Sequence, residues 1–125
     1  MIALKTAGII LIKIILIGIL LTTGCGEERI EETTTTMKLG TATYVGQVKD
    51  DKPHGHGTAI WPNGSNYVGE WENGFFNGQG TLSLADGIRY EGEWEKGRYH
   101  GHGTMTYPDG QIKEGKWENN VFVGE

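Results

Sequence analysis

The segment Tyr67-Val68-Gly69-Glu70-Trp71-Glu72-Asn73-Gly74 recurs after 23 residues as Tyr90-Glu91-Gly92-Glu93-Trp94-Glu95-Lys96-Gly97. Another copy begins 23 residues earlier, at Tyr44, and a more divergent copy begins at Lys113. A fixed period of this length indicates an array in which each copy is one supersecondary unit. The repeat therefore decides the fold of this 125-residue chain.

The second half of the unit repeats as well. A Gly-x-Gly-Thr motif returns at 55–58, 78–81 and 101–104, and a turn sequence ending in Gly64, Gly87 or Gly110 follows each copy. The whole pattern, Tyr-x-Gly-Glu-Trp followed by Gly-x-Gly-Thr and a turn, resembles the MORN repeat. The resemblance covers residues 44–125, with three full copies and a partial fourth. It implies a row of β-hairpins in one sheet.

Side-chain alternation predicts the same secondary structure. Tyr67, Gly69 and Trp71 share one face of an extended strand, and the residues between them share the other. Glycines on the ring-bearing face leave room for the rings. The fold class is therefore all-β: an elongated single-layer antiparallel sheet of tandem 23-residue hairpins. A left-handed backbone is expected at one loop position, where the four copies carry Asp51, Gly74, Gly97 and Asn120.

The N-terminal segment is typical of a secretory signal, with Lys5, a short apolar core and small residues before Cys25. The small residues ending in cysteine resemble a bacterial lipobox, although Thr22 stands where Leu is usual. The resemblance implies a signal peptide over 1–24 and a lipid on Cys25. An uncleaved membrane anchor and an ordinary cleaved signal are the alternatives. Residues 25–43 then form an acidic, Thr-rich tether, and 44–125 form the repeat domain.

Composition argues against several function classes. Residues 44–125 hold twelve acids and seven bases, so there is no basic stripe for nucleic acid. A single cysteine excludes an internal disulfide.

Catalytic and metal-binding chemistry is not expected. The two His-Gly-His groups at 54–56 and 100–102 are two repeats apart and cannot share a zinc ion, so they are interpreted as structural loop histidines. Glu70 and Glu93 recur at one register position, whereas paired-carboxylate catalysis needs two different environments. We therefore expect no enzyme activity, no cofactor and no metal site.

The aromatic face remains as the candidate binding surface. A one-layer sheet has no second layer, so the rings are expected to be partly exposed in an open groove. The residues assigned to this binding face are Tyr67, Trp71, Tyr90, Trp94, Trp61 and Tyr107.

The function expected from the sequence is a non-enzymatic binding or scaffolding module. It is anchored through lipidated Cys25 to the cell membrane or outer membrane, outside the cytoplasm, and its partner is a protein or a glycan. The alternatives are a module that binds envelope glycan or peptidoglycan through aromatic platforms, and an antitoxin or immunity-type protein.

Overall fold

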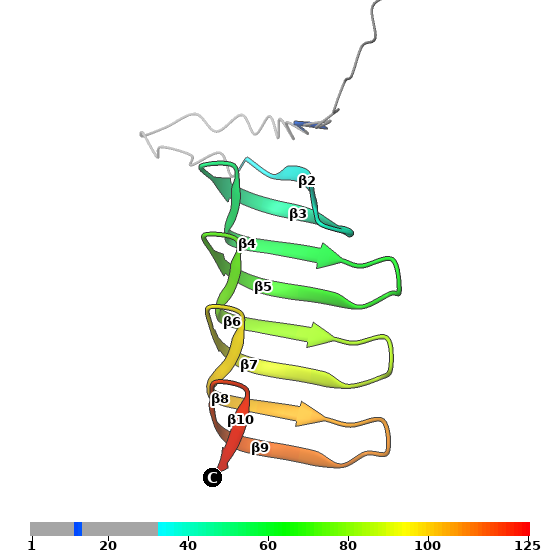
Figure 1. Cartoon of the computed structure of the whole chain (residues 1–125), viewed down its shortest axis with the longest axis vertical. Coiled ribbons are helices and arrows are strands. Elements are labelled where there is room, and N and C mark those ends of the chain that lie inside the picture. Colours follow the sequence, from blue (N-terminus) through cyan, green and yellow to red (C-terminus); the bar gives the residue numbers. More distant parts are fainter. Residues whose placement is uncertain (1–11, 14–32) are drawn as a thin grey trace, which may run out of the picture.

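The computed structural model describes residues 12–13 and 33–125, and every regular element in that part of the chain is a strand. The strands pair antiparallel with their sequence neighbours and form one ten-stranded sheet (Figure 1). They are β1 (Ile12–Lys13), β2 (Thr35–Leu39), β3 (Ala42–Lys49), β4 (Lys52–Ile60), β5 (Asn66–Glu72), β6 (Phe75–Ser83), β7 (Arg89–Glu95), β8 (Arg98–Thr106), β9 (Ile112–Glu118) and β10 (Val121–Gly124). The predicted elongated antiparallel sheet of tandem hairpins is confirmed.

The sheet begins earlier than the repeat pattern does. Strand β2 lies within the predicted tether, yet it pairs with β3 and sets Met37 opposite Tyr44. Thr35 is buried, and Met37 and Leu39 pack against the aromatic core. These few apolar residues add a strand to an edge that already exists, so the part of the predicted tether that forms β2 belongs to the sheet. Strand β1, from the predicted signal peptide, pairs with the other side of β2.

Two-residue turns close each hairpin at one edge of the array. Asn73 and Gly74 both have positive φ, 50° and 85°. Two central residues of this kind match a type I′ turn, which fits the right-handed twist of the paired strands. The predicted left-handed conformation is confirmed at the equivalent positions, which are Asp51, Gly74, Gly97 and Asn120. The amide of Gly74 also donates to the carbonyl of Pro53 at 2.9 Å, and the amides of Gly97 and Asn120 make the equivalent bonds, so these three tips are tied to the hairpin before them.

Longer turns at the opposite edge connect one hairpin to the next. In the first, the amide of Gly64 donates to the carbonyl of Trp61 at 3.0 Å, and Asn63 Oδ1 accepts from the amide of Ser65 at 2.9 Å. Asp86 and Asp109 repeat the second contact in the later copies. The predicted turns are therefore present, and a short polar side chain stabilises each.

Each hairpin bends sharply along its length. The pairing of β5 with β6 changes register between Gly69 and Trp71, and such a bulge bends the strand. Phe76, from the tip half of β6, consequently stacks on Tyr67 with ring centroids 3.7 Å apart and an interplanar angle of 10°. Figure 1 shows the strands curling round at the edge that carries the two-residue turns. The sheet thus covers its own aromatic face.

Glycines without side chains make this packing possible. Gly69 and Gly80 are in register on adjacent strands, and a Cβ at Gly80 would collide with the ring and hydroxyl of Tyr67. The equivalent contacts join Gly57 to Tyr44 and Gly103 to Tyr90. The predicted packing role of the strand glycines is therefore confirmed.

The close packing of the strand glycines predicts that one added methyl group lowers the stability of the fold. A Cβ at Gly92 would meet backbone atoms of Gly103 and His102, which cannot rotate away. We expect Gly92→Ala to lower the free energy of unfolding by about 1–3 kcal/mol, the usual cost of overpacking. Urea unfolding followed by circular dichroism measures this. Gly74→Asn is the control, because its surroundings are open and Asn120 takes the equivalent conformation. Equal stability of the two variants would contradict the packing.

Candidate functional site

The aromatic face does not form an open groove. Tyr67 and Tyr90 are 0% exposed, and Trp71 and Trp94 are 3% and 5% exposed. The prediction that these rings are partly exposed is therefore wrong. Its premise was that one sheet has no second layer, but the bend after the central glycines supplies one from the same strands. These four side chains belong to the core of the array, and a partner cannot contact them while the array is folded.

The polar atoms of the core rings are all used within the array. Tyr67 Oη donates to the carbonyl of Glu70 at 2.9 Å, at the bulge of its own strand. Trp71 Nε1 donates to the carbonyl of Gly57 at 3.0 Å, in the repeat before it. The same pair of bonds recurs for Tyr90 with Glu93, Trp94 with Gly80, and Trp117 with Gly103. The tyrosine therefore fixes the bulge, and the tryptophan joins adjacent repeats.

Burial changes the acidity of the core phenols. It raises the pKa of Tyr44 from 10 to about 12. The pKa of Tyr90 is also raised to about 12, mainly by burial and then by the charge of Glu93. The pKa of Tyr67 is raised for the same reasons, with Glu70 as the charge. These hydroxyls remain protonated donors at neutral pH.

The other two residues assigned to the binding face, Trp61 and Tyr107, are half-buried at the edge with the longer turns. Trp61 lies edge-on to Phe76 at 6.3 Å, and Lys113 Nζ lies 5.7 Å from the centre of the Tyr107 ring. Leu84 occupies the equivalent position in the repeat between them. The structure therefore does not bring Trp61 and Tyr107 together as one platform.

The opposite, outer face of the sheet carries two parallel rows of side chains, separated by the glycine pairs. The first row is Gln47, His56, Glu70, Gln79, Glu93, His102 and Lys116. The second row is Val45, Thr58, Val68, Thr81, Glu91, Thr104 and Glu114. The two rows and the glycine floor between them are called the trough below.

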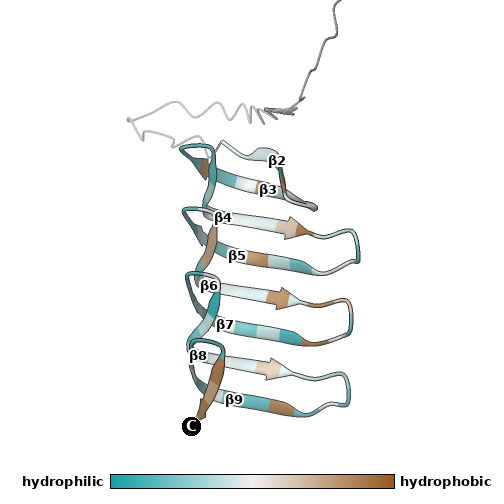
Figure 2. Cartoon of the chain, viewed as in Figure 1, coloured by the Kyte–Doolittle hydropathy of each residue, from teal (hydrophilic) through white to brown (hydrophobic). Residues whose placement is uncertain are grey.

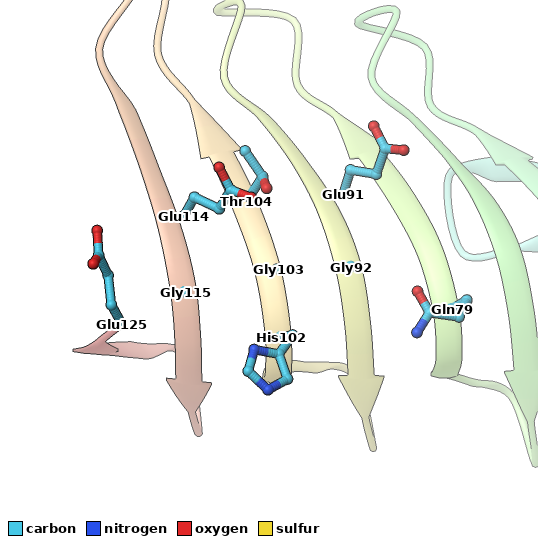
Figure 3. Close-up of a pocket in the computed structure, with 9 residues that line it drawn as sticks. All are labelled: Gln79, Glu91, Gly92, His102, Gly103, Thr104, Glu114, Gly115 and Glu125. Carbon is cyan, nitrogen blue, oxygen red and sulfur yellow. The ribbon is translucent and has the colours of Figure 1, made fainter.

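The trough is hollowed along the array. Three hollows of about 320, 450 and 740 Å³ follow one another from β3 to β9. His56 lines the first two, and Gln79 and Glu91 line the last two, so neighbouring hollows adjoin one another. Figure 3 shows the largest, with three glycines between Glu114 and Glu91 on one side and His102 on the other.

The trough changes in character along its length. Val45 and Val68 are 41% and 51% exposed at the β3–β5 end. Glu91 and Glu114 occupy the equivalent places on β7 and β9, and both are exposed. Figure 2 shows the middle of β5 as hydrophobic where the middle of β7 is hydrophilic. The trough therefore has an apolar end and an acidic end.

Glu70 and Glu93 have a structural role within the trough. Glu70 Oε2 accepts a hydrogen bond from the amide of Gln79, and Glu93 Oε2 accepts one from the amide of His102. In the first copy, Gln47 Oε1 accepts from the amide of His56 at 2.6 Å. Each acceptor satisfies an amide on the neighbouring strand where the bulge interrupts the ladder.

The two His-Gly-His segments lie within strands β4 and β8, so the interpretation as loop histidines is wrong. Their central glycines have φ of 76° and 61°, a conformation that glycine adopts readily, and both stay paired with the following strand. His100 Nε2 lies 3.1 Å from Glu95 Oε2. Across the described strands and turns, no group of three or more His, Cys, Asp or Glu side chains is arranged to hold a metal ion.

The second row of the trough was not predicted from the sequence. Its signal was present in the residue before each central glycine of the odd strands, which is Val45, Val68, Glu91 or Glu114. These positions lie opposite the rings in the alternation and vary in chemistry from copy to copy. Cys25 lies outside the described residues.

Comparison with protein families gives three consecutive matches to the MORN repeat, at residues 44–66, 67–89 and 90–112. The matches have the 23-residue period of the hairpins. No curated protein matches the chain.

The hydrogen bond accepted by the Glu70 carboxylate is expected to stabilise the fold independently of the negative charge. Glu70→Ala leaves the amide of Gln79 without its acceptor, which costs about 1–3 kcal/mol. Glu70→Gln keeps an acceptor oxygen, as Gln47 does in the first copy, and is expected to retain most of the stability. Chemical unfolding of both variants measures the difference. Equal losses would show that the negative charge, rather than the acceptor, is what matters.

The buried phenols predict unfolding in alkali. Since their folded pKa exceeds the unfolded value, the unfolded chain loses these protons first, and stability is fully present below pH 10 and lost as pH rises toward 12. Circular dichroism and tyrosinate absorbance, recorded together at constant ionic strength, are expected to change in one transition within this window. Titration of every tyrosine with no change in circular dichroism would contradict the buried assignment.

Proposed function

The chain belongs to the MORN-repeat family, and from this we propose that it is a non-enzymatic binding or scaffolding module of the bacterial cell envelope. The trough is its binding surface, and a lipid on Cys25 holds it at a membrane. The observation that carries the binding role is the trough itself. It crosses the outer face of all three matched repeats, and no element of the described chain covers it.

The repeating geometry favours binding over catalysis. Glu70 and Glu93 make the same hydrogen bond to the same position of the next strand. Acid–base catalysis by two carboxylates depends on environments that separate their pKa values. Side chains that repeat along a groove instead suit a partner that extends along several copies.

The membrane link is assigned to the N-terminal segment. A short apolar core followed by small residues and Cys25 supports processing to a lipidated cysteine. Among residues 12–13 and 33–125 there is no helix long and apolar enough to cross a bilayer. The acidic residues between Cys25 and β2 favour a position away from anionic headgroups. The trough is then presented to partners in the envelope.

Glycan binding on exposed aromatic rings has less support than binding of a partner in the trough. Trp71 and Trp94, the rings on which a sugar would stack, are in the core. The described trough is lined by carboxylates, amides, imidazoles, hydroxyls and valines, and neither row contains a Phe, Tyr or Trp side chain. A partner with cationic and apolar groups fits this lining better.

The anchor is tested by Cys25→Ser in cells supplied with a labelled fatty acid. We expect the wild-type chain to take up the label and enter the detergent phase, because each buried methylene contributes about 0.8 kcal/mol. The variant is expected to carry no label. Thr23→Ser, a conservative change beside the cysteine, is the matched control. An unlabelled wild-type chain that stays in the detergent phase at full length would instead establish an uncleaved anchor.

A further inference from the structure

The ligand of the trough can be specified further, on the basis of the binding role proposed above. We propose that the trough binds an extended peptide segment that lies across the strands, with apolar side chains over β3–β5 and cationic side chains over β7–β9. The peptide belongs to a partner protein.

The dimensions of the trough fit an extended peptide. Equivalent positions in consecutive repeats are two strands apart, roughly 10 Å at about 4.8 Å per strand. Three residues of an extended, polyproline-like chain span about 9 Å. One residue in three therefore meets the same position in each successive repeat. A Cβ at Gly57, Gly80 or Gly103 would point to the opposite, aromatic face, so the floor presents only backbone to the trough and the backbone of the peptide can approach the sheet closely.

Charge decides which end of the peptide lies where. The acidic end of the trough is lined by Glu91, Glu114 and Glu125, all of them exposed. Glu91 is paired with Arg89 at 3.1 Å, but both side chains are more than half exposed, and such a pair is easily exchanged for another cation. Lys116 is the one lysine or arginine in the two rows. Cationic side chains therefore match this end.

The other end of the trough matches apolar side chains. Val45 and Val68 flank Thr58 there, and the first-row partners are Gln47 and His56. No carboxylate lines this hollow. Two exposed valines, 23 residues apart in the chain and one repeat apart in space, offer contacts at the same spacing as the carboxylates beyond them.

Other occupants fit less well. The segment between Cys25 and β2 carries four glutamates, which the acidic end would repel. Nucleic acids and anionic headgroups carry the wrong charge for the same reason. A cationic, partly apolar peptide is the occupant that both ends attract.

Isothermal titration calorimetry on the lipidated chain in neutral detergent tests the proposal. The first peptide is Ile-Pro-Pro-Ile-Pro-Pro-Lys-Pro-Pro-Lys-Pro-Pro, which presents one anchor every third residue. The second has the same composition with the two isoleucines and the two lysines made contiguous. We expect the spaced peptide to bind about tenfold more tightly, which corresponds to about 1.4 kcal/mol. Added salt is expected to weaken binding, because the charges are exposed.

Matched variants locate the binding. Glu114→Gln is expected to weaken the spaced peptide about two- to fivefold, the range for an exposed ion pair. Asp51→Asn, in the turn between β3 and β4 and outside the trough, removes the same charge and is expected to leave affinity unchanged, because Asn120 takes the equivalent backbone conformation. Both residues are exposed, so both variants should fold, and thermal melting on the same samples checks this.

Two results would overturn the ligand class. One is equal or absent binding of the two peptides. The other is binding of anionic vesicles in place of the peptides. Either result, obtained while Cys25 still takes up fatty acid, leaves the proposed membrane anchor standing and rejects only the peptide. Equal weakening by the Glu114 and Asp51 variants would show that net charge, and not the trough, attracts the peptide.

Discussion

A tyrosine ring lying on a pair of cross-strand glycines is the contact on which the array depends. Tyr67 covers Gly69 and Gly80, and its hydroxyl holds the bulge that follows. Without the bulge the hairpin would stay straight, and Phe76 would not reach the ring. Trp71 then carries the contact to the preceding repeat through its indole nitrogen. Each repeat completes its neighbour, so the stability of the array comes from contacts between adjacent copies.

Much of the fold could be predicted from the sequence because its signals are local. The 23-residue period, the alternation around Trp71, and Gly or Asn at the tight turns each report on a few residues at a time. The bend could not be predicted in this way. Tyr67 and Trp71 remain on one face whether the strand is straight or bulged, so side-chain alternation does not reveal the bulge between them. The bulge closes the aromatic core, and this is why the predicted open groove is absent.

The candidate site was missed for a related reason. Inward positions such as Tyr67 and Tyr90 must be alike because they fill the same space. Outward positions face solvent and have no such requirement, so Val68 can be replaced by Glu91 one repeat later without disturbing the core. The sequence-based prediction of the site rested on the positions that repeat. In this array the residues that differ between copies are the ones that give the surface its apolar and acidic ends.

The strands run across the long axis of the array, so the ladder hydrogen bonds point along it (Figure 1). A tensile load applied between an anchor before β2 and a partner at the β10 end would therefore pull on the ladder bonds one strand pair at a time. Ladder hydrogen bonds loaded in this direction break one after another and do not share the force. Each 23-residue repeat that opens releases about 80 Å of chain. Under tension the array would therefore lengthen in equal steps, one for each repeat that opens.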